Sequence, residues 1–164
     1  MLTTLCYSHL VPTDNSTAFR RFTRAVFAAQ AAVLRHGDTA NAPTGQSSAR
    51  WRVLRAIDDG HTSVAAAARF MGSSRQSVQR LADALIDEGL VEAEGQDDDR
   101  RVKLLRLTAQ GQRVHDALEE NFDTWADRLL VHIRADDLAA VSQGLEQITY
   151  IINADREYLL RKEQ

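Results

Sequence analysis

Residues 62–89, TSVAAAARFMGSSRQSVQRLADALIDEG, decide the fold of this chain because they predict two short helices joined by a tight turn. The first helix, over 62–70, starts at hydroxyl residues, is rich in alanine and stops where Gly72 permits a turn. The second restarts at Ser73 and Ser74 and ends at Gly89, which suits the left-handed residue that closes many helices. The stretch therefore predicts a helix-turn-helix unit.

The second helix has two chemically distinct faces. Apolar residues recur at three- and four-residue spacing and predict a buried stripe: Val78, Leu81, Ala82 and Leu85. The opposite face, near the N-terminal end, carries Arg75, Gln76, Gln79 and Arg80. Arginine can bond guanine and glutamine can bond adenine through paired contacts in the major groove, where all base pairs are distinguishable. Ser73 and Ser74, with the free N–H groups of the helix start, suit a phosphate. An ordinary solvated helix face is the alternative.

A hairpin is predicted directly after this helix. Two β-compatible runs, 90–95 and 102–107, flank the polar turn Gln96-Asp97-Asp98-Asp99-Arg100-Arg101. Asp99 is close enough in sequence to Arg100 and Arg101 to orient them, which leaves a guanidinium to reach a narrow groove. The alternative is a solvated acidic turn with incidental arginines.

These motifs resemble the MarR (multiple antibiotic resistance regulator) family of winged helix-turn-helix transcription regulators. Residues 72–81 resemble the recognition helix of that family, and Asp99-Arg100-Arg101, Leu104 and the run Leu107-Thr108-Ala109-Gln110-Gly111 match its wing signature. Trp51-Arg52-Val53-Leu54 resembles the family's second helix, although Arg50 stands where glutamine is common.

The resemblance implies roles for individual residues. The residues that would meet the major groove are Ser74, Arg75, Gln76, Gln79 and Arg80. Arg101 would enter the minor groove with Asp99 as its orienting partner, while Arg100 would touch phosphate. The resemblance also implies an effector cleft beside the winged unit, for which the candidate wall residues are Phe22, Trp51, Arg55 and Val114; for each of them, plain core or surface is the competing interpretation.

Charge distribution is compatible with a DNA partner despite a net charge of −3. Residues 69–106 contain seven basic and eight acidic side chains, and five of the acids lie at the far end of the second helix or on the first strand. The edge expected to face DNA can therefore be positive while the domain is neutral. Nonspecific affinity should accordingly be modest.

The remaining sequence predicts helices around this unit. Apolar residues recur at helical spacing over 19–33, 114–129 and 138–159, and a linker is expected over 37–45. The fold class is thus mainly α (α+β), a winged helix-turn-helix domain whose N- and C-terminal helices form a dimerisation region. We expect one MarR-like domain over 1–164, with its DNA-binding part over 47–108 and its dimerisation part over 14–36 and 109–160. The apolar surface of these three helices is larger than a small winged domain can cover. A second copy of the chain is therefore expected to cover it.

Other classes of function have less support. A chain with one cysteine, no secretion signal and no long apolar run is expected in the cytoplasm. Cys6, near Tyr7 and His9, is either a sensor or a terminal packing residue. The histidines lack metal-ligand spacing, and no catalytic constellation or phosphate-binding glycine loop is present, so neither cofactor, metal nor enzymatic activity is expected.

The sequence thus predicts a homodimeric regulator that binds a pseudo-palindromic site in double-stranded DNA, a repressor released by a small-molecule effector. The alternative function is a winged-helix interaction or dimerisation module that does not bind a specific DNA sequence.

Overall fold

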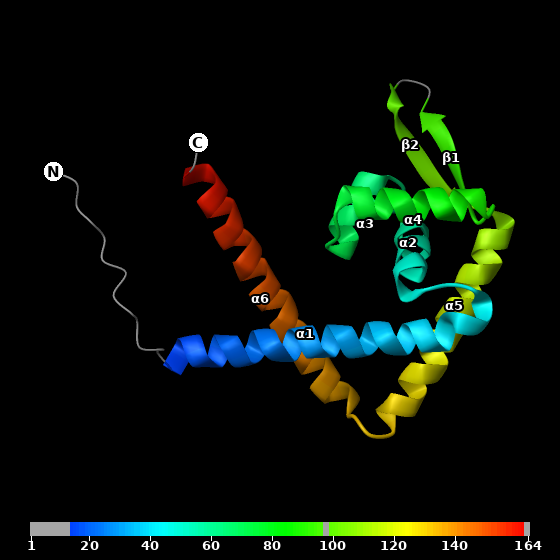
Figure 1. Cartoon of the computed structure of the whole chain (residues 1–164). Helices are drawn as coiled ribbons and strands as arrows, with labels where there is room; N and C mark the ends of the chain where they lie inside the picture. Colours follow the sequence, from blue (N-terminus) through cyan, green and yellow to red (C-terminus); the bar gives the residue numbers. More distant parts are fainter. Residues whose placement is uncertain (1–13, 97–98, 163–164) are drawn as a thin grey trace. The chain divides into compact units, whose positions relative to one another are not determined.

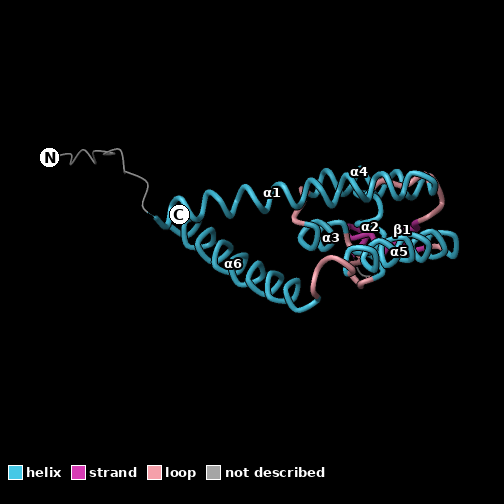
Figure 2. The backbone as a smooth tube through the Cα atoms, turned by 90° about the horizontal axis from the view of Figure 1, so that it is seen from below, coloured by secondary structure: helices cyan, strands magenta, loops and turns pink. Residues whose placement is uncertain are grey.

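A computed structural model describes residues 14–96 and 99–162, with the side chains of 96–102 excluded. Its elements are α1 (Asp14–Asn41), the 3₁₀ helix η1 (Ala42–Thr44), α2 (Ser48–Asp58), α3 (Val64–Met71), α4 (Arg75–Asp87), β1 (Val91–Gln96), β2 (Asp99–Leu107), α5 (Ala109–Leu130) and α6 (Ala135–Lys162) (Figure 1). One hairpin interrupts a series of helices in the described chain (Figure 2). The mainly helical, winged helix-turn-helix fold class is confirmed.

The chain forms two compact units that divide inside α5, between Leu118 and Glu119. The first unit contains α1 to β2 and the start of α5, and the second contains the rest of α5 and α6. Within α6, all of which is described, no residue is buried. The ordered hydrophobic core therefore lies in the first unit.

That core is formed where α2 packs against α3 and α4. The side chains of Val53, Leu54, Val78, Ala82 and Leu85 have no solvent exposure. The predicted apolar stripe of the second helix is confirmed at three positions, and Leu81 is half-buried. Trp51, Leu54 and Ile57, which recur at helical spacing on α2, are also buried. Burial of one face of α4 leaves its other face to solvent.

The predicted linker over 37–45 is wrong in its first half, because α1 continues to Asn41. Gly37 is a helical residue at a close approach: a Cβ there would collide with the Ser48 hydroxyl. That hydroxyl donates to the Leu34 carbonyl at 2.9 Å, and the Ser48 N–H donates to Asp38 Oδ1 at 2.7 Å. The last turns of α1 therefore cap the start of α2, and these tertiary contacts favour helix over linker.

The helix predicted from residue 62 begins two residues later. Ser63 is the N-cap of α3, since its hydroxyl accepts from the Ala66 N–H at 3.2 Å. Thr62 instead uses its carbonyl to accept from the Leu105 N–H of β2 at 2.6 Å. Residue 62 thus joins the hairpin to the helix pair. Gly72, with φ of 61°, closes α3 as expected from its conformational freedom.

The hairpin pairs β1 with β2 in antiparallel register from Val91 opposite Leu107 to Gly95 opposite Lys103. The register then shifts, so that Gln96 lies opposite Asp99. The predicted wing is therefore present, and it extends from the C-terminal end of α4 (Figure 1).

A tight junction ties α5 to the turn between α4 and β1. The Thr108 hydroxyl donates to the Gly89 carbonyl at 2.7 Å and accepts from the Gly111 N–H at 3.0 Å, so it also caps α5. The Thr108 N–H donates to the Leu90 carbonyl at 3.1 Å. A Cβ at Gly111 would overlap the Leu90 carbonyl oxygen and lie 2.8 Å from its carbon. Only glycine permits this approach of helix to backbone.

No helix in the described part of the chain is both long and apolar enough to cross a membrane.

The junction predicts that Gly111→Ala destabilises the fold. The added methyl meets backbone, which cannot rotate away, so we expect a loss of about 1–3 kcal/mol in the free energy of unfolding. Gly95→Ala is the control, because a Cβ at Gly95 meets nothing within 4 Å. Urea unfolding of both variants checks this; equal stability of Gly111→Ala and the wild type would contradict the assigned contact.

Candidate nucleic-acid interface

One face of α4 presents a row of polar side chains to solvent. Arg75, Gln76, Gln79 and Arg80 are all exposed, and the opposite face is buried against the core. A helix anchored on one side and polar on the other can enter the major groove of B-DNA, whose width of about 12 Å admits a helix. The structure brings these four predicted residues onto one surface.

The serines at the start of α4 have different roles. Ser74 is the N-cap, and its hydroxyl accepts from the Ser77 N–H at 3.1 Å. That hydroxyl retains its own hydrogen, so it can approach a phosphate only as a donor. The half-buried Ser73 directs its hydroxyl to the Met71 carbonyl, 3.5 Å away. Ser74 is thus better placed than Ser73 for the predicted phosphate contact.

Two arginines of α2 contact the helix pair, which the sequence analysis did not predict. Arg52 Nη2 donates to the carbonyl of Met71, the last residue of α3, at 2.6 Å. Arg50 forms an ion pair with Glu88, the C-cap residue of α4. In the sequence, Arg50 stands where glutamine is common in the MarR family, and this departure is the available signal for its role. Arg50 restrains the C-terminal end of α4 and Arg52 restrains the end of α3, and neither contact requires DNA.

The ion pair also changes the acidity of Glu88. The hydrogen bond from Arg50 is the main influence that holds the pKa of Glu88 below its ordinary value of 4.5, and partial desolvation opposes it. The side chain of Arg50 is largely buried, with 17% exposure, and that of Glu88 is 46% exposed. The pair therefore contributes a modest, pH-dependent restraint on the end of α4.

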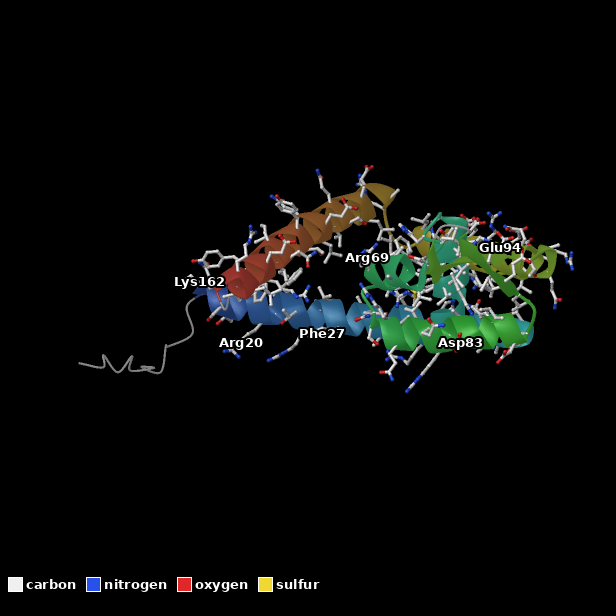
Figure 3. The ribbon with its side chains drawn as sticks, turned by 90° about the horizontal axis from the view of Figure 1, so that it is seen from above. Arg20, Phe27, Arg69, Asp83, Glu94 and Lys162 are labelled. Atoms are coloured by element: carbon white, nitrogen blue, oxygen red, sulfur yellow. The ribbon has the colours of Figure 1, made fainter. Side chains whose placement is uncertain are left out.

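The hairpin carries its own charges. Arg106 Nε lies 3.0 Å from Glu94 Oε2 across the two strands, so that this glutamate is paired. Figure 3 labels Glu94 on the hairpin. The backbone of Asp99, Arg100 and Arg101 lies in β2, but their side chains fall outside those the structure describes, and the predicted orientation of Arg101 by Asp99 stays a prediction.

Of the four candidate effector residues, Trp51 and Arg55 are in direct contact. Arg55 Cζ lies 5.8 Å from the centroid of the Trp51 ring, and Trp51 is 9% exposed. Phe22 is half-buried in α1, where it stacks on Phe19 at 5.9 Å, and Val114 is half-buried in α5. Cys6, Tyr7 and His9 lie outside the described residues.

Comparison with known proteins agrees with this geometry. The sequence model of the MarR family matches residues 44–102, the segment from η1 through most of the hairpin. An uncharacterized protein of Mycobacterium tuberculosis (strain H37Rv) is 33% identical over 141 residues, which cover 86% of this chain and 99% of that protein.

Solved structures of similar fold include the transcriptional repressor CouR bound to a 23-mer DNA duplex. It has 26% identity and a TM-score of 0.70, and the match covers 76% of this chain and 89% of CouR. CouR from Rhodococcus jostii RHA1 bound to p-coumaroyl-CoA has 25% identity and a TM-score of 0.68, with 76% of this chain and 88% of that chain covered.

The Arg50–Glu88 pair predicts a pH-dependent effect of Glu88→Gln. Because the folded-state pKa is lowered, the carboxylate stabilises the fold above pH 4.5, and this contribution is lost as pH falls through the folded-state value. We expect Glu88→Gln to cost about 0.2–1 kcal/mol at pH 7, a range suited to a half-exposed pair, and this cost should shrink as pH falls below 4.5. Thermal unfolding over a series of pH values checks this, with the exposed Glu92→Gln as control; a deficit that does not change with pH would assign the loss to packing.

Proposed function

The chain belongs to the MarR family of DNA-binding transcription regulators, and from this premise we propose that it acts as a homodimeric, sequence-specific repressor that a small molecule releases from its operator. The observation that carries the proposal is the exposed polar row on α4, fixed by a buried opposite face and by the ion pair of Arg50 with Glu88, the C-cap residue of α4.

In the proposed complex, α4 enters the major groove with its N-terminal turns first. Arg75 and Arg80 suit guanine, Gln76 and Gln79 suit adenine, and Ser74 suits the phosphate backbone. A reading helix that is held rigidly loses little conformational freedom on binding, which favours discrimination between sequences. The structure of CouR bound to a DNA duplex supports DNA binding by a chain of similar fold.

The hairpin supplies a second contact in the proposed complex. Arg101 enters the minor groove, where a guanidinium responds to the enhanced negative potential of a narrow groove, and Arg100 meets phosphate. Glu94 also lies on the hairpin, and its negative charge would repel the DNA phosphates. Because Glu94 is paired with Arg106, that repulsion is reduced. Asp99 orients Arg101 in this proposal.

Exposed apolar side chains support a second copy of the chain as the partner. On α1, Phe19, Phe27 and Val33 are 51%, 68% and 46% exposed, and Figure 3 labels Phe27 on that helix. On α6 the exposed apolar residues include Leu138, Val141, Leu145, Ile152 and Leu159. A helix of 28 residues without a single buried side chain needs a partner to cover its apolar surface.

Two-fold symmetry would place two copies of α4 about 34 Å apart, one turn of DNA. The proposed operator is accordingly a pseudo-palindrome.

A small-molecule effector completes the proposal. Arg55, whose side chain is 42% exposed and lies over the ring of the largely buried Trp51, supplies a cation that suits a ligand with negative charge. Phe22 and Val114 are retained as wall residues. The CouR structure with p-coumaroyl-CoA supports ligand binding in a related chain.

Selection of bound DNA from a random library tests sequence recognition. Arg75→Ala and Gln79→Ala should each lose about 1–3 kcal/mol on the selected site and relax its base preference, since each removes a paired base contact. Arg113→Ala removes an exposed arginine of α5 and serves as the charge-matched control. Full affinity and unchanged preference in both α4 variants would refute the reading-helix assignment, and a wild-type chain that selects no sequence would favour the interaction module instead.

Sedimentation tests assembly. Leu145→Glu or Ile148→Glu would place an unpaired carboxylate in the proposed interface, a change costly enough to dissociate or unfold the dimer. Gln143→Glu adds the same charge at an exposed polar position of α6 and should leave the dimer intact. A wild-type chain that sediments as a monomer at micromolar concentration would exclude the dimer and the palindromic operator with it.

A further inference from the structure

A side-chain hydrogen bond lies on the proposed base-reading helix. Gln79 Nε2 donates to Asp83 Oδ1 at 2.7 Å, and both side chains are exposed. Figure 3 labels Asp83 on α4. The two residues are four positions apart, the spacing at which side chains meet on one helix face. The bond therefore restrains the Gln79 side chain, which contacts a DNA base in the proposed function.

The chemistry of the pair fixes which end of the amide faces the carboxylate. An ionised carboxylate only accepts hydrogen bonds, so the amide nitrogen of Gln79 must point toward Asp83 and the amide oxygen away from it. One N–H is engaged in this bond. Oε1 and the second N–H remain available for a base, as one acceptor and one donor. This combination complements N6–H and N7 of adenine.

We propose that Asp83 is a positioning residue that fixes the orientation of Gln79 and thereby sets the base preferred where Gln79 reads DNA. The inference rests on the proposed function, since it requires α4 in the major groove. Without Asp83, the amide can rotate and offer its N–H groups to the acceptors of guanine as readily as it offers Oε1 and N–H to adenine. The preference at that one position then relaxes.

The charge of Asp83 acts in a different way from its hydrogen bond. A carboxylate near phosphates weakens binding to every sequence by repulsion, an effect that falls with added salt. The hydrogen bond instead distinguishes one base from another at a single position. Asp87 lies four residues further along α4, is also exposed and also carries a negative charge, so it provides a charge-matched control.

Selection from a random DNA library, performed with the full-length wild type and the variants Asp83→Ala, Asp83→Asn and Asp87→Ala, separates the two effects. We expect Asp83→Ala to reduce the preference for the selected base at one position by about threefold to tenfold, a scale set by the rotamer freedom that Gln79 regains. Asp83→Asn should retain the preference, because its amide oxygen can accept the same bond. Asp87→Ala should raise affinity for all sequences alike.

A double variant tests whether Asp83 acts on base preference only through Gln79. In Gln79→Ala, the further change Asp83→Ala should alter no base preference, since the side chain that Asp83 positions is gone. Far-UV circular dichroism at the assay temperature confirms that each variant is folded.

Two results overturn the inference, and they are distinguishable. If Asp83→Ala binds every sequence more tightly with unchanged base preference, as expected for Asp87→Ala, then Asp83 acts only through its charge and the proposed function stands. If the wild-type chain selects no sequence at all, both the proposed function and the role of Asp83 are refuted.

Discussion

The approach of α5 to the backbone of Leu90 is the constraint that organises the DNA-binding unit. It is possible only because residue 111 is glycine, and it is locked by the Thr108 hydroxyl, which bonds the Gly89 carbonyl and the Gly111 N–H together. This one junction satisfies polar backbone groups at the end of α4, at the entry to β1 and at the start of α5. The direction of α4, the base of the hairpin and the first turn of α5 are thereby determined together.

The sequence pattern predicts what local chemistry controls. The buried stripe of α4, its start at Ser74 and the hairpin all follow from spacing, capping and turn rules, and all are observed. The errors occur where a tertiary contact decides. Gly37 was expected to end a helix, but the contacts of Ser48 with Leu34 and Asp38 make it a packing glycine inside one. Thr62 was expected to be helical, but its carbonyl is bonded by β2.

In the candidate site too, local sequence predicts some features, whereas tertiary contacts determine others. The exposed face of α4 could be identified from periodicity, because exposure on a helix follows from which positions are apolar. The supporting contacts of Arg50 and Arg52 could not, because each joins residues distant in the chain. Both arginines lie on α2, two residues apart, yet Arg52 bonds the end of α3 and Arg50 pairs with the C-cap residue of α4. A polar helix face alone is a common feature of soluble proteins; a polar face on a helix that is buried on its other side and restrained at its end by a largely buried arginine is prepared to bind with little loss of entropy.

The continuity of α5 has a consequence for how the proposed dimer would read DNA. This helix begins at the junction beside α4 and passes without interruption into the second unit. If a second copy covers the apolar surface of α6, the separation of the two reading helices depends on the angle at which α5 leaves the Gly111 contact. Binding to a palindrome tolerates little change in that separation, because both helices must meet grooves one turn apart. The other support of α4 comes from α2, whose Arg50 pairs with the C-cap residue Glu88 one residue before the Gly89 carbonyl that Thr108 bonds, so the ion pair and the junction meet at the same end of α4.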